Sequence, residues 1–239
     1  MEARIPTVGE VREMHPAELA VVLSTLELEG ILALDRDGCE SVVVATQKVA
    51  SWMHAMQAAT VDRFAELTAD DLEVHVADLE VEREARRAAG RPVVEHVPVP
   101  EPDAIAASSL APLLNIAPRT MRTRLNRARL LMELPATLDH AMTGRLEPWR
   151  VDGVVTAAGD VSWERLGEFE ARLYAADVSR LPKPRLVDRA RKAAAKADPD
   201  GSARAHDRGP RHRRPRWHCL LYTSPSPRDR TRSRMPSSA

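Results

Sequence analysis

The sequence predicts an all-α protein, a multi-helix bundle with one long core helix, a helix-turn-helix-like element and a disordered C-terminal tail. The chain of 239 residues is 44% hydrophobic but only 3% aromatic, so aliphatic side chains must fill its core. Apolar residues recur at helical spacing, and proline or glycine marks the breaks between these stretches. We therefore expect a frayed N-terminus at residues 1–15, a helical domain at 16–200 and a disordered tail at 201–239.

The first part of the helical domain favours a short helix followed by a long one. Pro16 suits the first turn of a helix that covers PAELAVVLSTLEL. Residues 41–67 then place apolar side chains at helical spacing over several turns, which predicts the central core helix. We expect its Met and Trp side chains to be buried in packing rather than to line a ligand pocket. The apolar stripe comprises Val42, Ala45, Val49, Trp52, Met53, Met56, Phe64 and Leu67.

A charged segment at residues 68–102 follows the predicted core helix. Thr68, with Asp71 three residues later, resembles a capping box, so a separate helix is expected from Thr68 to about Ala89. Its acids come early and its arginines late, an order that complements the helix dipole and needs no functional explanation. The next stretch, RPVVEHVPVPEPD, contains four prolines and predicts an extended linker.

Two helical patterns meet at a polar break within IAASSLAPLLNIAPRTMRTRLNRARLLM, residues 105–132. A serine pair can cap the first helix, and a start at Ser109 places Pro112 in the first turn, where proline is tolerated. Asn115 at the break tolerates left-handed backbone geometry, and Pro118 suits the first turn of the second helix. This layout predicts the helix-turn-helix-like element.

The second of these helices has an apolar side and a basic side. Its expected core stripe consists of Met121, Leu125, Ala128 and Met132. Residues 118–132 also contain five arginines and no acid. Arginines and short polar side chains near a helix N-terminus can contact phosphates and base edges in a major groove of double-stranded DNA. The candidate DNA-binding residues are Arg119, Thr120, Arg122, Thr123, Arg124, Asn126, Arg127 and Arg129. The alternative is a solvated basic face on an ordinary bundle helix.

Short helices with short loops complete the predicted bundle. They cover a segment up to Met142, closed by Gly144, and then residues 147–158, with Trp149 and Val154 facing inward. Ser162 is expected to cap a helix that reaches residue 176. A last basic helix, RLVDRARKAAAKA, ends before Asp198.

Charge and cysteine usage restrict the function classes. Residues 1–200 hold 25 Lys+Arg against 33 Asp+Glu, and residues 201–239 hold 10 against 2, so any affinity for nucleic acid must come from local patches. Cys39 and Cys219 stand in dissimilar contexts, which predicts neither a disulfide framework nor a metal site. We expect a cytoplasmic protein without a signal peptide, a membrane span or a cofactor.

The order and spacing of several blocks make residues 16–201 similar to the actinobacterial domain-of-unknown-function 222 family. The blocks are PAELAVVLSTLEL, VASWMHAMQAATVDRFAEL, LNIAPRTMRTRLNRARLLMELPATLDHAMTGRLEPWRV and a basic helix that ends KADPDG. Pro112 and the length of the charged segment depart from the family's usual pattern. The resemblance implies an all-helical domain that often precedes an HNH endonuclease domain.

Residues 219–239 resemble a translated sequencing adapter rather than a protein family. The similar stretches are CLLYTSPSPRD at 219–229 and SRMPSSA at 233–239. This resemblance implies that residues 219–239 are an artefact and that the native C-terminus is missing.

Two hypotheses of function follow. In the first, the chain is the helical DNA-binding or regulatory module of an HNH-endonuclease-like protein and is not itself an enzyme. Arg119, Thr123 and Arg127 are then the best candidates for DNA contact, with Arg122, Arg124 and Arg129 on phosphates. A divalent metal is expected only in the absent HNH domain. In the second, the chain is a scaffold or self-association module in which the arginines pair with the acids of residues 68–84.

Overall fold

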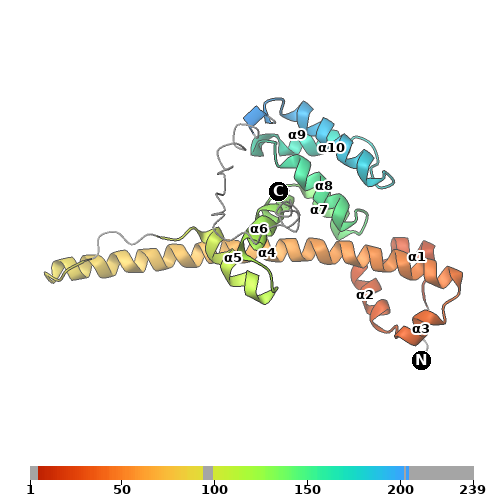
Figure 1. Ribbon diagram of the computed structural model, residues 1–239, viewed down its shortest axis with the longest axis horizontal. Coiled ribbons are helices and arrows are strands. Elements are labelled where there is room, and N and C mark those ends of the chain that lie inside the picture. Colours follow the sequence, from red (N-terminus) through yellow and green to blue (C-terminus); the bar gives the residue numbers. More distant parts are fainter. Residues whose placement is uncertain (1–4, 94–98, 202, 205–239) are drawn as a thin grey trace, which may run out of the picture. The chain divides into compact units, whose positions relative to one another are not determined.

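The structure, a computed structural model, describes residues 5–93, 99–201 and 203–204, and all regular structure within them is helical (Figure 1). The helices are α1 (Val8–Glu13), α2 (Pro16–Ser24), α3 (Leu28–Leu32), α4 (Arg36–Ala88), α5 (Pro102–Leu113), α6 (Pro118–Met132), α7 (Pro135–Met142), α8 (Pro148–Ala158), α9 (Leu166–Leu173) and α10 (Lys183–Ala197), with a 3-10 helix η1 (Trp163–Arg165). The all-α prediction with one long helix is confirmed. Residues 1–202 form one unit, and every contact described below lies within it.

The predicted C-terminal tail falls mostly on residues 205–239, which lie outside the described residues. So does the segment that resembles a translated adapter. At the start of the predicted tail, Gly201 is buried, and its N–H donates to the carbonyl oxygen of Asp198 at 3.1 Å. The packed unit therefore extends one residue beyond the boundary expected at residue 200.

α4 is one helix of 53 residues, whereas the sequence predicted two. It begins earlier than expected because the Asp35 side chain caps it, accepting from the N–H of Gly38 at 2.8 Å. Thr68 does not cap a second helix. Its hydroxyl donates to the carbonyl oxygen of Phe64 at 2.7 Å, a bond to the preceding turn of a continuing helix. Since no glycine or proline lies between residues 39 and 89, nothing in the chain interrupts the helix.

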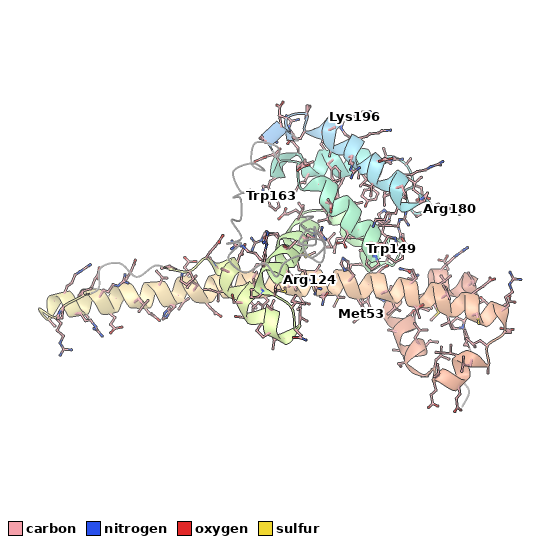
Figure 2. All side chains as sticks on the ribbon, in the orientation of Figure 1. Met53, Arg124, Trp149, Trp163, Arg180 and Lys196 are labelled. Atoms are coloured by element: carbon pink, nitrogen blue, oxygen red, sulfur yellow. The ribbon has the colours of Figure 1, made fainter. Side chains whose placement is uncertain are left out.

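Small side chains form the buried side of α4. The buried residues of this helix are Ser41, Ala45, Ser51, Ala55 and Ala65. The expected burial of the methionines is wrong, because Met53 is 56% and Met56 42% exposed. Figure 2 marks Met53 on α4. Small side chains allow neighbouring helices to come close, and α1, α2, α5, α6, α7 and α8 all contact α4.

Residues 7–14 form a capped helix, α1, where we expected a frayed N-terminus. Thr7 and Glu10 form a capping box at the start of α1, and Val11 is buried. Lys48 of α4 satisfies carbonyl oxygens at the other end of this helix. Its ammonium group donates to those of Val11 at 3.2 Å, Arg12 at 2.7 Å and Met14 at 2.7 Å.

A buried carboxylate from α9 caps α7. Leu134, at the N-cap position, offers no side-chain acceptor. The Glu170 carboxylate accepts from the N–H groups of Ala136 at 3.1 Å and Thr137 at 2.8 Å, and from the Thr137 hydroxyl at 2.7 Å. The Tyr174 hydroxyl donates to the same Thr137 oxygen, and burial raises the pKa of Tyr174 to about 12. These bonds join two helices that are far apart in the sequence.

A buried arginine, rather than a tryptophan, anchors the start of α8. The expected inward direction of Trp149 is wrong, since this side chain is 47% exposed, whereas Val154 is buried as predicted. Arg150 is 5% exposed and donates to the carbonyl oxygens of Val178 at 2.6 Å and Ser179 at 2.9 Å. The guanidinium thus ties α8 to the loop before α10.

We predict that Glu170→Ala lowers the free energy of unfolding by about 3 kcal/mol, because three donors lose a charged acceptor inside the protein. Chemical denaturation followed by circular dichroism measures the change. Glu168→Ala is the matched control, since Glu168 pairs with Arg172 at an exposed site and contributes less than about 0.5 kcal/mol. Equal effects of the two substitutions would show that Glu170 is not a structural cap.

Candidate nucleic-acid interface

α5 and α6 form the helix-turn-helix-like element, but α5 is longer than the sequence predicted. It begins at Pro102 after an N-cap at Glu101, and not at Ser109. Pro112 therefore lies inside the helix, one residue before its end. Proline leaves the carbonyl oxygen of Ser108 without an intrahelical donor. Because Ser108 and Pro112 are both exposed, water can satisfy this oxygen, and the helix tolerates the proline.

The turn between the two helices is a Schellman motif. The N–H of Ile116 donates to the carbonyl oxygen of Ala111 at 3.0 Å, and that of Asn115 to Pro112 at 3.1 Å. Asn115 has φ of 52°, the left-handed conformation that the sequence predicted for it. Pro118 then stands in the first turn of α6, also as predicted. The sequence of the break therefore determines where α6 starts.

The apolar side of α6 faces α4 and α5, which leaves a polar side exposed. Met121, Leu125 and Ala128 are buried as predicted, whereas Leu131 is buried in place of the half-buried Met132. The exposed candidate residues are Arg119, Thr120, Thr123, Arg124, Asn126 and Arg127. Arg122 and Arg129, on the flanks, are only half-exposed. Six of the eight candidates thus share one accessible face.

Arg129 is held by acids on two other helices. Its guanidinium makes a bidentate pair with Asp103 of α5, with both N–O distances 3.0 Å, and its Nε lies 3.7 Å from Oδ1 of Asp62 on α4. The hydrogen bond to Asp103 raises the pKa of Arg129. Burial raises the pKa of Asp62, and the nearby Glu66 adds to this rise. Arg129 therefore fixes α6 to α4 and α5, which removes it from the set of free phosphate contacts.

Two more candidates also have acidic partners. Arg122 pairs with Glu101, the N-cap residue of α5. Arg127 lies 3.6 Å from the Asp152 carboxylate of α8, and about half of each side chain is exposed, so solvent screens this pair. None of these acids belongs to residues 68–84, so within the chain these arginines pair with other acids than the scaffold hypothesis expected. Glu101 and Asp103 flank Pro102 in the sequence, a signal of partners for the arginines that our sequence analysis missed.

The guanidinium groups of Arg119 and Arg124 have no ion pair or hydrogen-bond partner in the described part of the chain. Figure 2 marks Arg124 on α6. Thr123 lies between them and donates its hydroxyl to the carbonyl oxygen of Arg119 at 3.1 Å, which leaves the hydroxyl oxygen free to accept. Charges without an internal partner are available to an external anion. The outward face of α6 therefore has two free guanidinium groups beside polar side chains.

A groove borders this face. It has a volume of 390 Å³ and lies between α4, α6 and α8. His54, Gln57, Arg124, Arg127 and Asp152 are its polar lining residues. Gln57 and His54 come from α4, so the surface next to the candidate residues includes polar side chains that the sequence did not indicate.

These features define an all-α protein with a basic helix-turn-helix-like element. Comparison of the chain with family models, with curated proteins and with solved structures finds no match. Among the residues that the structure describes, no group of His, Cys, Asp or Glu side chains has an arrangement suited to a metal ion. None of the described helices combines the length and the apolar composition of a membrane-spanning segment.

We predict that Asp103→Ala lowers the free energy of unfolding by about 1 kcal/mol, because it removes a bidentate partner of Arg129.

Asp62→Asn should leave stability at neutral pH unchanged or raise it. Since the folded chain raises the pKa of Asp62, the folded state binds its proton more tightly than the unfolded state. Lowering the pH from 7 toward the ordinary carboxyl range should therefore stabilise the wild type relative to Asp62→Asn.

Thermal unfolding of both variants and the wild type between pH 4 and 7 measures these effects. A loss of stability in Asp62→Asn as large as that in Asp103→Ala would show that Asp62 is a required ion-pair partner.

Proposed function

We propose that this chain is the helical DNA-binding or regulatory module of an HNH-endonuclease-like protein, and that α6 contacts double-stranded DNA. The outward face of α6 carries this proposal, because Arg119 and Arg124 are exposed without an internal partner beside three short polar side chains. We also propose membership of the domain-of-unknown-function 222 family, on the similarity of sequence blocks described above. On this proposal the chain is not an enzyme, and a divalent metal belongs with the nuclease domain.

The size and chemistry of α6 suit a major groove. A helix of 15 residues is about 22 Å long, and the groove of B-form DNA admits a helix. Arginine can bind guanine through two hydrogen bonds and asparagine can do the same with adenine, which gives Arg119, Arg124 and Asn126 the means to contact base edges. The positive end of the helix dipole near Arg119 favours phosphates.

The ion pairs of α6 divide the candidate residues by role. Arg122 and Arg129 are used to hold the helix on Glu101, Asp103 and Asp62. We therefore assign DNA contact to the exposed residues, Arg119, Thr120, Thr123, Arg124, Asn126 and Arg127. We place the protein in the cytoplasm, the compartment that its two unrelated cysteines favour.

We predict that Arg119→Ala combined with Arg124→Ala weakens binding to a labelled random-sequence duplex by about tenfold or more at low salt. The slope of log K against log salt should become shallower by about two, because two phosphate neutralisations are lost. Fluorescence anisotropy between 50 and 200 mM KCl measures both. Arg122→Ala is the matched control on the same helix, and it should change the slope less, since Glu101 already pairs with Arg122.

The second candidate function is a scaffold that associates with a second copy of itself. Leu67, Val74 and Val81 of α4 are 45%, 63% and 68% exposed and recur every seven residues, and no side chain of α4 is buried after Ala65. Absence of duplex binding at low salt, together with a dimer mass by light scattering, would overturn DNA binding in favour of this candidate.

A further inference from the structure

A second basic surface lies on α10, the helix that follows the last loop of the bundle. Residues 183–197 contain six cations and a single acid, Asp188. One of the cations, Arg189, is half-buried and donates to the carbonyl oxygen of Leu173 at 2.8 Å. The other five side chains are exposed. They are Lys183, Arg185, Arg191, Lys192 and Lys196.

These five cations have no acidic partner, in contrast to three of the five arginines of α6. Acids from α4, α8 and the start of α5 pair with three arginines of α6. Within the described residues, no ion pair or hydrogen bond engages any of the five exposed cations of α10. Their positive charge is therefore directed to solvent and is available to a polyanion.

Three of the five cations lie in a row along the exposed side of α10. Arg185, Lys192 and Lys196 are separated by seven and four residues, spacings that place side chains on one face of a helix. The row spans about 16 Å, which is comparable to the length of about five phosphates on one strand of B-form DNA. Figure 2 shows Lys196 near one end of this helix and Arg180 just beyond the other.

The opposite edge of α10 shares a groove with α6. This groove has a volume of 670 Å³, and its lining includes Arg127 of α6 together with Lys183 and Arg191 of α10. Asp152, Asp160 and Asp198 also line it, so three acids balance the three cations of this groove. One cation of α6 and two of α10 therefore border the same groove, while the row of Arg185, Lys192 and Lys196 lies on another side of α10.

The packing of α8 against α10 fixes the separation of the two basic surfaces. A β-carbon at Gly153 would lie 2.7 Å from a methyl group of Val187, so α10 packs on α8 at a distance that only glycine allows without a shift. α6 also contacts α8. Both basic helices are thus attached to the same central helix.

We propose that the exposed cations of α10 form a second phosphate-binding surface, which contacts the DNA backbone beside the segment that α6 contacts. This inference rests on the proposed DNA-binding function and adds to it a site without base contacts. Lysine and arginine at such a site contribute affinity and salt dependence rather than sequence preference.

The test compares the full chain with three variants on a labelled random-sequence 30-bp duplex, from 50 to 200 mM KCl. The first variant, Arg185→Ala/Lys192→Ala/Lys196→Ala, removes the α10 row. The second, Arg36→Ala/Arg63→Ala/Arg86→Ala, is the matched control, because it removes three exposed cations of α4, each paired with an acid one turn away. The third is the α6 variant described above. All carry the same arginine-containing residues 203–239, so that segment contributes equally.

We expect the α10 variant to make the slope of log K against log salt shallower by about two to three, while the α4 control leaves it unchanged. An unchanged slope in the α10 variant, with a reduced slope in the α6 variant, would overturn this inference and leave the proposed function standing. A reduced slope in the α10 variant, with an unchanged slope in the α6 variant, would support the α10 surface and overturn the assignment of DNA contact to α6. Equal effects of the α10 variant and the α4 control would show a net-charge effect and overturn the inference, and no binding by the wild type would overturn both proposals.

Discussion

The close approach of other helices to α4 is the constraint on which the rest of the structure depends. The buried positions of this long helix hold only serine and alanine, so helices before and after it in the chain can pack directly on its backbone. Gly144 extends the same principle, because a β-carbon there would lie 2.1 Å from Cγ of Lys48. A larger side chain at one of the buried positions of α4 would displace the helices that support α6.

Ion pairs then determine which side of α6 is accessible. Arg129 lies between Asp103 and Asp62, and Arg122 pairs with Glu101, so the flanks of the helix are attached to α4 and α5. Arg119 and Arg124 are left on the outward side. The same arginine-rich sequence thus provides both the attachment and the exposed charge. The exposed cations of α10 add to this charge on a chain whose residues 1–200 carry more acids than bases.

The sequence predicted those features whose conformation depends on the residue at that position, such as turns and helix starts. Asn115 and Pro118 specified the turn and the start of α6, because backbone conformation at these positions depends mainly on the residue itself. The continuity of α4 through Thr68 was not predictable from a capping pattern, since a threonine hydroxyl can bond either forward or backward. The buried carboxylate of Glu170 joins segments that are distant in the sequence, so no local pattern indicates its role. Asp103 beside Pro102 did indicate an acid available to the arginines, but not that Arg129 is the one that it binds.

We propose that Arg119 and Arg124, which have no acidic partner, contact DNA, whereas Arg122 and Arg129 hold α6 in place through their ion pairs. The most direct measurement is the NMR signal of each arginine Nε–H during titration with the random-sequence duplex. We expect the signals of Arg119 and Arg124 to shift while that of Arg129 stays in place, because the hydrogen bonds of the Arg129 guanidinium to Asp103 persist. Unshifted signals for Arg119 and Arg124 in the presence of saturating duplex, or an equal shift for Arg129, would contradict this proposal.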